Sequence, residues 1–337
     1  MKILALETSC DETSAAVIED GRTVLADIIA SQIDIHRRFG GVVPEIASRH
    51  HIEDVMPVVA EALTTAGLTL ADIDAIAVTQ GPGLVGALLV GVACAKALSF
   101  AAAKPLLAVN HMEGHIYANL VAHPDLEPPF LTLVVSGGHT MLVDVPAYNE
   151  FQLLGETKDD AAGEAFDKIA RVMGYPYPGG PHIDRLAAEG NPHAIEFPQA
   201  LRNEDNFDFS FSGVKSAVLN YLHNCEQRGE TYRPEDVAAS FQHAVVNVLV
   251  EKTIRAAQQQ HRDIVCIAGG VAANSGLRQE LAAACERAGL RLLTPDLRFC
   301  TDNAVMIGSR AFYQYEAGQF ADWTLNADPR LPFRGTM

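Results

Sequence analysis

Residues 130–145 read FLTLVVSGGHTMLVDV, in which two apolar runs flank a short turn that contains two glycines. The pattern predicts a β-hairpin, with strands at residues 131–135 and 140–145. Residues 2–19 read KILALETSCDETSAAVIE and show the same order, with a polar turn between two apolar runs. A hairpin pattern that occurs twice in one chain indicates an internal repeat.

The sequence on either side of the hairpins extends this repeat. A third strand is predicted at residues 24–30 and again at 151–156, and helical periodicity follows from residue 44 to 66. A buried strand, a glycine turn and a helix come next at residues 73–100, and this order returns at 263–288. We therefore expect an α/β protein of two tandem domains, each a mixed five-stranded sheet flanked by helices.

The length of 337 residues suits two domains. The repeat predicts an N-terminal domain at residues 1–110 and a C-terminal domain at residues 111–317. An insertion at about residues 174–224 is rich in Pro, Gly, Phe and Asp and matches neither repeat. Residues 318–337 form a C-terminal tail.

The composition is that of a soluble globular protein, with 48% hydrophobic and 20% charged residues. The longest apolar region, residues 84–109, is interrupted by Lys96, Lys104 and Pro105, which favours a buried helix and a core strand over a membrane span. Glu7 ends the first apolar run too early for a signal peptide. The six cysteines form no CxxC pair and fit free thiols, so we expect a cytoplasmic protein without a membrane partner.

The net charge of −17, from 42 acidic and 25 basic residues, argues against strong non-specific binding of nucleic acid. An RNA partner would therefore need a local basic patch or a helper protein. The densest basic stretch runs from His36-Arg-Arg38 to Arg49-His-His51. It is compatible with an RNA contact, with a solvated helix end and with a protein interface.

His111-Met-Glu-Gly-His115 is the clearest candidate for a metal site. On a helix, residues i and i+4 project from one face, as two imidazoles that share an ion must. The glutamate is the third residue of the five, which excludes a zinc-protease HExxH motif. Asp302 is the best third ligand, although it is equally compatible with a plain helix N-cap. The two histidines are also compatible with a surface pair that binds nothing.

Several turns are candidates for binding an anion or a nucleotide. Ser136-Gly-Gly-His139 offers backbone N–H groups without side chains in the way, although an ordinary hairpin turn has the same pattern. Gly269-Gly270, followed by Asn274 and a helix, is a second such turn. Asp167 lies among apolar neighbours on a predicted helix, and Asp184 follows a rigid Pro-Gly-Gly-Pro loop.

Taken together, these motifs closely resemble those of the tRNA adenosine threonylcarbamoyltransferases, the TsaD family. This family belongs to the actin-like ATPase, sugar kinase and heat-shock chaperone superfamily. The resemblance covers almost the whole chain up to about Gly318. The matching segments are Glu7-Thr-Ser-Cys-Asp-Glu-Thr13, Gly40-Gly-Val-Val-Pro-Glu45, Gly81-Pro-Gly-Leu-Val-Gly86, His111-Met-Glu-Gly-His115, Val135-Ser-Gly-Gly-His139, Asp160-Ala-Ala-Gly-Glu-Ala-Phe-Asp167, Tyr177-Pro-Gly-Gly180, Phe209-Ser-Phe-Ser-Gly213, Ala268-Gly-Gly-Val271 with Asn274, and Cys300-Thr-Asp-Asn303.

The resemblance implies two actin-like, or ribonuclease H-like, domains with an active-site cleft between them. It implies that His111, His115 and Asp302 bind one divalent metal ion, Fe²⁺ or Zn²⁺. It implies a pocket for threonylcarbamoyl-adenylate, lined by Val134, Val135, Ser136, Gly137, Gly138, Asp167, Gly180, Asp184 and Asn274. The group is transferred to the exocyclic amine of the adenosine 3′ of the anticodon, in tRNAs that read codons beginning with A, and AMP leaves.

An adenine amine is a poor nucleophile, so removal of its proton assists the attack. Asp11, in the turn of the first hairpin, is our candidate for this base. The resemblance also implies two helper proteins, a catalytically inactive paralogue like TsaB and a small ATPase like TsaE. The enzymatic alternative is an ATP-dependent small-molecule kinase of the same superfamily, which has no use for His111 and His115. A nucleotide-gated chaperone is the non-enzymatic alternative, but no separate peptide-binding domain follows the second half.

Overall fold

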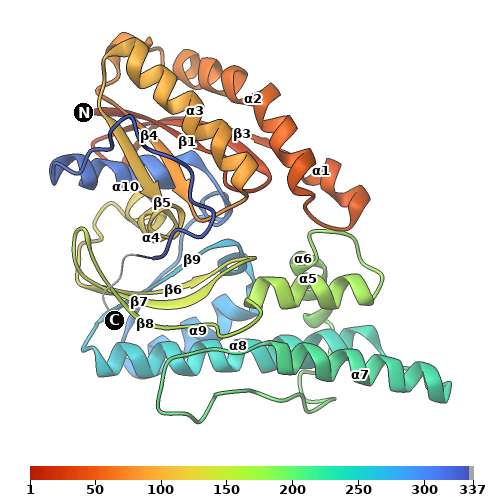
Figure 1. Ribbon diagram of the computed structural model, residues 1–337. Coiled ribbons are helices and arrows are strands. Elements are labelled where there is room, and N and C mark those ends of the chain that lie inside the picture. Colours follow the sequence, from red (N-terminus) through yellow and green to blue (C-terminus); the bar gives the residue numbers. More distant parts are fainter. Residues whose placement is uncertain (334–337) are drawn as a thin grey trace. The chain divides into compact units, whose positions relative to one another are not determined.

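The computed structural model describes residues 1–333, and over that range the chain folds into two compact units (Figure 1). The first unit comprises Met1–Glu127, Ala147–Asn149 and residues 295–333. The second comprises Pro128–Pro146 and Glu150–Thr294. Among the described residues each unit contains one five-stranded sheet, as the sequence predicted.

The first sheet begins with a meander of antiparallel strands and ends with two strands parallel to its first. The strand order is β3-β2-β1-β4-β5. The bounds are β1 (Lys2–Glu7), β2 (Glu12–Glu19), β3 (Thr23–Ser31), β4 (Ala75–Gly81) and β5 (Leu106–Asn110). The predicted strands therefore form, with ends that differ from the prediction by one or two residues.

Alternation along β1 divides the first unit into layers. Ile3 and Ala5 pack with the helices α4 (His111–Ala122) and α10 (Ala304–Glu316). Leu4 and Leu6 pack on the opposite face with two long helices that lie side by side in Figure 1. These are α2 (Pro44–Thr65) and α3 (Val85–Ala102), and the short helix α1 (Ile33–His36) precedes them.

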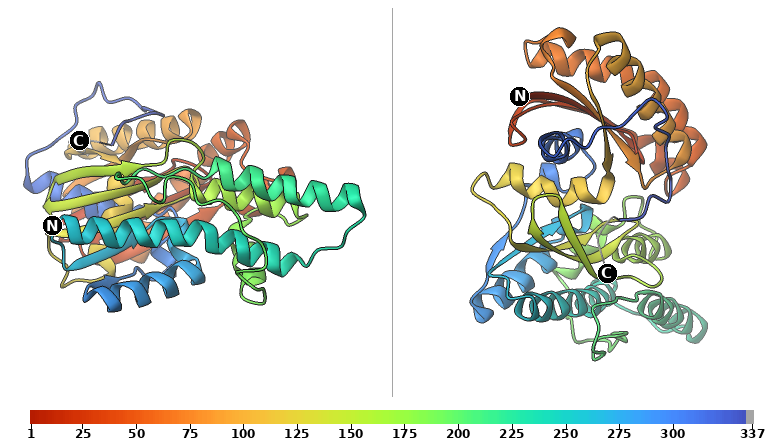
Figure 2. Two further views of the ribbon diagram at one scale, coloured as in Figure 1. Left: turned by 90° about the horizontal axis from the view of Figure 1, so that it is seen from below. Right: turned by 60° about the vertical axis from the view of Figure 1, so that its left-hand side comes forward.

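The second sheet repeats the topology of the first, in the order β10-β9-β6-β7-β8. Its first three strands form an antiparallel meander and its last two run parallel to β6. The helices that surround it are visible in both views of Figure 2. The bounds are β6 (Phe130–Val135), β7 (Thr140–Ala147), β8 (Glu150–Glu156), α5 (Ala162–Val172), α6 (Gly180–Ala187), α7 (Ser212–Arg228), α8 (Pro234–Gln259), β9 (Ile264–Ala268), α9 (Ser275–Ala288) and β10 (Arg291–Leu293).

The division into units differs from the boundary that the sequence predicted after residue 110. Helix α4 belongs to the first unit, and so does α10, which lies in the segment from Pro295 that follows the second unit in sequence. The physical reason is burial: Val305, Met306 and Ile307 of α10 enter the same core cluster as Ile3 and Ala5 of β1. The first unit is therefore completed by the last part of the chain.

Among the described residues, α3 is the one helix long and apolar enough to cross a membrane by length and composition. One side of α3 is buried on the first sheet, through residues that include Leu88, Val92 and Ala95. Another side lies along α2. The helix is therefore a layer of the folded first unit, as the interruption of the apolar region at Lys96 and Lys104 predicted.

Candidate metal centre and glycine turns

His111, His115 and Asp302 come together in the first unit, with ligand atoms that all lie within 4.8 Å of one another. Helix α4 presents both imidazoles, whose ring centroids are 4.7 Å apart. Oδ1 of Asp302 lies 3.3 Å from Nε2 of His111 and 3.2 Å from Nε2 of His115. Asp302 comes two residues before α10, so the fold of the first unit joins this ligand to α4. The i, i+4 spacing in the sequence predicted this convergence of the two histidines.

Glu7 orients His111, although the sequence had not singled it out as a site residue. Its side chain is fully buried at the end of β1, and its Oε2 lies 3.0 Å from Nδ1 of His111. The same oxygen accepts a 2.6 Å hydrogen bond from the hydroxyl of Thr79. Because the carboxylate accepts the Nδ1 proton, Nε2 of His111 is left with a lone pair that faces Asp302. The sequence signals for Glu7 were its place as the acidic end of an otherwise apolar strand and as the first residue of the matching segment Glu7-Thr-Ser-Cys-Asp-Glu-Thr13.

The three side chains could hold a divalent metal ion. His115 is 1% exposed, and among the described residues neither of its ring nitrogens makes a hydrogen bond of good geometry. A buried imidazole nitrogen without such a bond is costly, and a metal ion close to Nε2 would remove that cost. Two imidazoles and one carboxylate are a donor set for zinc or iron that keeps at least one coordination position open.

The charged side chains of this group shift one another's pKa values. Burial by itself would lower the pKa of His111, but the carboxylates of Asp302 and Glu7 outweigh it and raise that pKa well above its ordinary value. Burial would raise the pKa of Asp302, but the positive charge of His111 outweighs it and lowers that pKa. Burial lowers the pKa of His115. A metal ion that binds here would therefore displace a proton from His111.

Asp11 lies in the turn between β1 and β2 and is 4% exposed. The turn is fixed by His51 of α2, whose Nε2 donates a 2.9 Å hydrogen bond to the carbonyl of Cys10. Nδ1 of His51 then accepts a 2.7 Å hydrogen bond from the hydroxyl of Thr13. The backbone N–H of Gln32 donates to the carbonyl of Asp11 itself. Asp11 therefore stands on a backbone that is held from two sides.

In the second unit, the turn between β6 and β7 presents two open glycines. A Cβ atom added to Gly137 or Gly138 would have no neighbour within 4 Å. The turn is closed by a 2.8 Å hydrogen bond from the Ser136 N–H to the His139 carbonyl. Helix α5 begins directly against it, since a Cβ on Gly163 would lie 2.5 Å from the Ser136 carbonyl oxygen. Close packing on one side and open space on the other suit the binding of an anion by backbone N–H groups.

The other predicted residues of the second unit are joined by hydrogen bonds. Oδ1 of Asp167 in α5 accepts from the backbone N–H groups of Gly179 and Gly180, at 2.7 and 3.3 Å. Gly180 begins α6, and Asp184 in the same helix accepts from the N–H and the hydroxyl of Ser275. Asn274, which precedes Ser275, is the N-cap of α9, and its side-chain amide also donates a hydrogen bond to Gln242. The sequence had not pointed to Ser275 or Gln242, because neither forms a recognisable motif.

Val134 and Val135 complete the predicted set, at the end of β6 beside β9. Both are fully buried, so they offer main-chain atoms and not side chains. Gly269, which follows β9, has φ of +88°, and a Cβ there would lie 2.4 Å from the Val135 carbonyl oxygen. The two predicted glycine turns of the second unit therefore meet at the carboxyl ends of β6 and β9, where open α/β sheets commonly bind ligands.

The basic stretch between residues 36 and 51 is interrupted by burial. His36 and His51 are 0% exposed, and burial lowers the pKa of each. Both are therefore largely neutral near pH 7. The exposed arginines of the stretch are Arg37, Arg38 and Arg49. The surface formed by residues 36–51 therefore carries less positive charge than the sequence indicated, because two of its histidines are buried and neutral.

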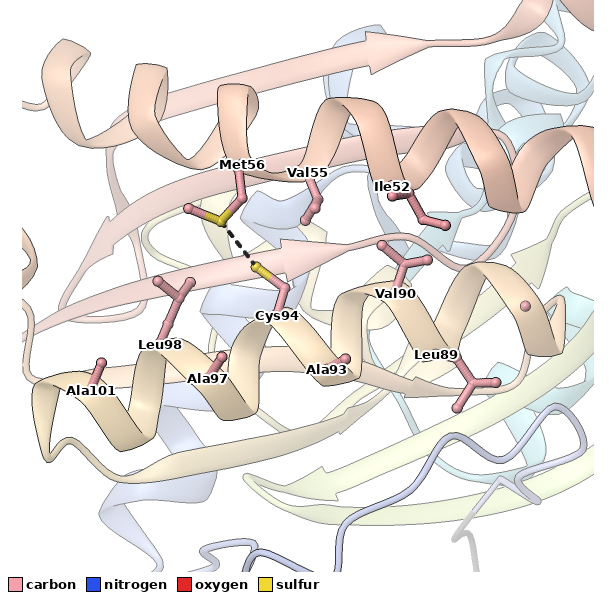
Figure 3. Close-up of a pocket in the computed structure, with 11 residues that line it drawn as sticks. Ile52, Val55, Met56, Leu89, Val90, Ala93, Cys94, Ala97, Leu98 and Ala101 are labelled. Atoms are coloured by element: carbon pink, nitrogen blue, oxygen red, sulfur yellow. Dashed lines mark hydrogen bonds between the residues drawn. The ribbon is translucent and has the colours of Figure 1, made fainter.

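Helices α2 and α3 leave an open apolar groove between them, of about 710 Å³ (Figure 3). Ile52 and Met56 of α2 are 65% and 52% exposed, and Leu89 of α3 is 45% exposed. Cys94 lies on the floor with its Sγ 3.8 Å from the Met56 sulfur, and burial raises the pKa of this thiol to about 11. The lining residues are Ile52, Val55, Met56, Gly86, Leu89, Val90, Ala93, Cys94, Ala97, Leu98 and Ala101.

The model of one protein family, "TsaD: tRNA N6-adenosine threonylcarbamoyltransferase", matches residues 23–309. The chain belongs to the TsaD family. A relative in Moorella thermoacetica, named tRNA N6-adenosine threonylcarbamoyltransferase, is 61% identical over 330 residues, which is 98% of this chain and 96% of the relative. A relative of the same name in Clostridium botulinum strain 657 is 59% identical over 331 residues, 98% of this chain and 97% of its own length.

Solved structures place this TsaD chain in the actin-like ATPase fold. HypF from T. kodakarensis superposes with a TM-score of 0.64 at 14% identity, over 96% of this chain and 48% of that chain. Component A of (R)-2-hydroxyglutaryl-CoA dehydratase from Acidaminococcus fermentans superposes with a TM-score of 0.57 at 16% identity, over 94% of this chain and 98% of that chain. At such identities the likeness shows the fold alone.

Proposed function

We propose that this chain is a tRNA N6-adenosine threonylcarbamoyltransferase. The observation that carries the proposal is the 61% identity to a transferase of that name over 98% of the chain. The donor is threonylcarbamoyl-adenylate and the acceptor is the exocyclic amine of the adenosine 3′ of the anticodon, in tRNAs that read codons beginning with A. A bond forms between the carbamoyl carbon and the amine nitrogen, the bond from that carbon to the phosphate oxygen of AMP breaks, and the amine loses a proton.

His111, His115 and Asp302 would hold one Fe²⁺ or Zn²⁺ ion. The donor set supports this, because imidazole and carboxylate ligands suit both metals. A bound ion supplies Lewis acidity toward carbonyl and phosphate oxygens. Glu7 keeps His111 in the tautomer that can act as a ligand, through the 3.0 Å contact at Nδ1.

The second unit would bind the adenylate part of the donor. Backbone N–H groups of the turn at Ser136, Gly137 and Gly138 would face its phosphate, because no side chain covers the two glycines. Val134 and Val135 would contribute main-chain atoms beneath that turn. Asp167, Gly180, Asp184 and Asn274 would line the rest of the pocket, and the hydrogen bonds between α5, α6 and α9 would keep it preorganised.

Asp11 would accept the proton that the adenine amine loses. A carboxylate on a backbone fixed by His51 and Gln32 is held in one position, which a general base requires.

The acceptor is a tRNA, and the acidic chain of net charge −17 would rely on helpers to bind it. These are a catalytically inactive paralogue like TsaB and a small ATPase like TsaE, in the cytoplasm.

The paralogue would dock on the apolar groove between α2 and α3. A paralogue of this fold would carry an equivalent pair of helices, and two such grooves would bury each other's apolar surface. Leu89→Glu would place a charge in the apolar lining of this groove. We expect Leu89→Glu to abolish co-elution with the paralogue, and Val172→Glu, at an exposed apolar position on α5, to leave it intact. Co-elution of the Leu89→Glu protein would exclude the groove as the docking surface.

A reconstitution tests the function. The purified chain, the two helpers, threonylcarbamoyl-adenylate and unmodified tRNA are mixed, and the digested tRNA is analysed for threonylcarbamoyladenosine by mass spectrometry. We expect product with the unaltered chain and none with His111→Ala. Absence of product with confirmed donor and helpers would reject the transferase, and small-molecule kinase substrates would then be tested.

A further inference from the structure

The chain after α10 runs back along the first unit and crosses the strands β4 and β5 (Figures 1 and 2). The Ala321 N–H donates to the carbonyl of Leu106 at the start of β5. Lys96 of α3 donates to the carbonyl of Leu325 at 2.9 Å. Leu325 and Ala327 pack against the core beneath α2 and α3. Residues 318–333, the described part of the tail that the sequence left without a role, are therefore part of the first unit.

Residues 326–332, here named the C-terminal strap, lie against the end of β4. The Asp328 N–H donates a 2.9 Å hydrogen bond to the carbonyl of Gln80. The approach is so close at Gly81 that a Cβ atom there would lie 1.8 Å from the Asp328 carbonyl oxygen. The Gly83 N–H donates to the carbonyl of Pro329 at 3.3 Å. The strap therefore contacts both sides of the turn that leads into α3.

The strap also reaches the first residue before the metal-binding helix. Asn110 ends β5, and its Oδ1 caps α4 by accepting a 2.9 Å hydrogen bond from the Met112 N–H. Its Nδ2 donates to the carbonyl of Pro332 at 3.2 Å. Asn110 is 4% exposed, so this amide has no ready substitute partner in water. One side chain thus joins the strap to the turn of helix that carries His111.

A second path leads from the strap to the same histidine. Gly83, which the strap holds, packs against Ser9, and the Leu84 N–H donates a 2.8 Å hydrogen bond to the Ser9 carbonyl. The Ser9 hydroxyl lies 3.2 Å from Nδ1 of His111. The helix start and the turn beside the imidazole are therefore both braced by the strap.

We infer that the C-terminal strap is a positioning element of the metal centre, which fixes His111 through Asn110 and through the turn at Gly83. In this role the strap acts through Asn110 and Gly83 and supplies no ligand of its own. The inference rests on the metal centre proposed above. Residues that orient metal ligands change metal affinity about 10- to 100-fold when they are removed, so loss of the strap weakens metal binding by about 10-fold or more.

The test is titration of the metal-free chain with Co²⁺, followed by the visible absorption of the bound ion. The chain truncated after Leu325 lacks the strap, and the chain truncated after Phe333 keeps it. We expect the first to bind Co²⁺ about 10-fold more weakly, with changed visible bands, and the second to match the full chain. A dissociation constant within about twofold of the full chain, in a strapless protein with unchanged circular dichroism, would overturn the inference.

Point variants keep the test decisive if the truncated chain does not fold. Gly81→Ala pushes the strap away, and Gly41→Ala is its matched control, because the two glycines have φ of +155° and +152° but Gly41 has nothing within 4 Å. Asn110→Ser retains a helix cap but cannot reach Pro332. We expect weaker Co²⁺ binding in Gly81→Ala and Asn110→Ser and unchanged binding in Gly41→Ala. Equal binding in all three would overturn the inference, whereas an unaltered full chain that binds no Co²⁺ would instead reject the metal centre.

Discussion

Asp11 is 4% exposed and stands on a turn whose carbonyls are held by His51 and by the backbone of Gln32. Such a carboxylate can be replaced by an amide of the same shape with little disturbance of the turn. The substitution removes the ability to accept a proton and keeps the size and shape of the side chain. At the scale of a single residue, the role of Asp11 can therefore be tested separately from folding.

We expect Asp11→Asn to lower single-turnover transfer by about 100-fold or more, since a general base typically contributes that much. The affinity for threonylcarbamoyl-adenylate is expected to stay unchanged. Rapid-quench measurements with saturating donor and tRNA give the rate. Asp34→Asn serves as control, because Asp34 is 88% exposed and pairs only with nearby Arg37 among the described contacts. A normal rate for Asp11→Asn would remove Asp11 from the mechanism.

His51 gives a prediction about stability and pH. Burial lowers its pKa below the ordinary value of 6.5, so below about pH 6.5 the unfolded chain binds a proton that the folded chain does not. Stability is therefore present above that pH and is lost as the pH falls. We expect the urea midpoint to drop between pH 7.5 and 5.5, and to drop less in His51→Gln. An equal drop in both proteins would show that His51 does not contribute to the pH dependence.

The site residues that could be predicted from the sequence alone were those with a fixed local spacing. His111 and His115 are one helical turn apart, so their convergence follows from the helix alone. Glu7 could not be found in this way, because its role depends on Thr79 in a parallel neighbouring strand and on the first residue of α4. Likewise, nothing local shows that His51 is buried under the turn at Cys10 and carries no surface charge.

At the scale of elements, α5 begins in contact with the glycine turn that it supports. Gly163 is the second residue of α5, and a Cβ there would meet the Ser136 carbonyl oxygen at 2.5 Å and Gly137 at 2.8 Å. These neighbours are backbone atoms, so they cannot move aside as a flexible side chain can. A larger residue at Gly163 must therefore displace the turn.

We expect Gly163→Ala to weaken binding of the adenylate about 10-fold or more, because the turn would be displaced from the position proposed to receive the phosphate. Gly213→Ala is the matched control: Gly213 is the second residue of α7, and a Cβ there has nothing within 4 Å. It should bind normally and gain up to about 1 kcal/mol in stability from helix propensity. Calorimetric titration with a non-hydrolysable adenylate analogue measures the binding affinity of both variants. Normal binding by Gly163→Ala would separate this turn from the donor site.

The order of elements could be predicted from the sequence, but their grouping into units could not. The repeated hairpins predicted two sheets of equal topology, and the structure contains them. The predicted boundary after residue 110 followed the repeat, whereas packing joins α10 to β1 through Ile307 and Ile3. Packing between residues about 300 positions apart depends on which apolar faces fit together, and no local sequence pattern predicts it.

At the scale of the whole molecule, the net charge of −17 opposes binding to a polyanion. We expect the chain alone to bind tRNA weakly at 150 mM salt, and to bind it tightly once the helpers are added. Fluorescence anisotropy of labelled tRNA at several salt concentrations measures this. The double variant Arg37→Glu/Arg38→Glu should weaken tRNA binding further; if it abolishes helper binding alone, this segment is a protein interface. Tight, salt-insensitive binding by the chain alone would contradict the expectation.

The first unit takes α10 from a segment that follows the second unit in sequence, and this has a consequence for synthesis on the ribosome. The second unit is nearly continuous from Pro128 to Thr294, so it can fold as soon as it has left the exit tunnel. The first unit emerges earlier but must wait for α10, with part of its sheet still uncovered. Asp302 arrives just before that helix, so the nascent chain gains this candidate metal ligand only after the second unit has been synthesised.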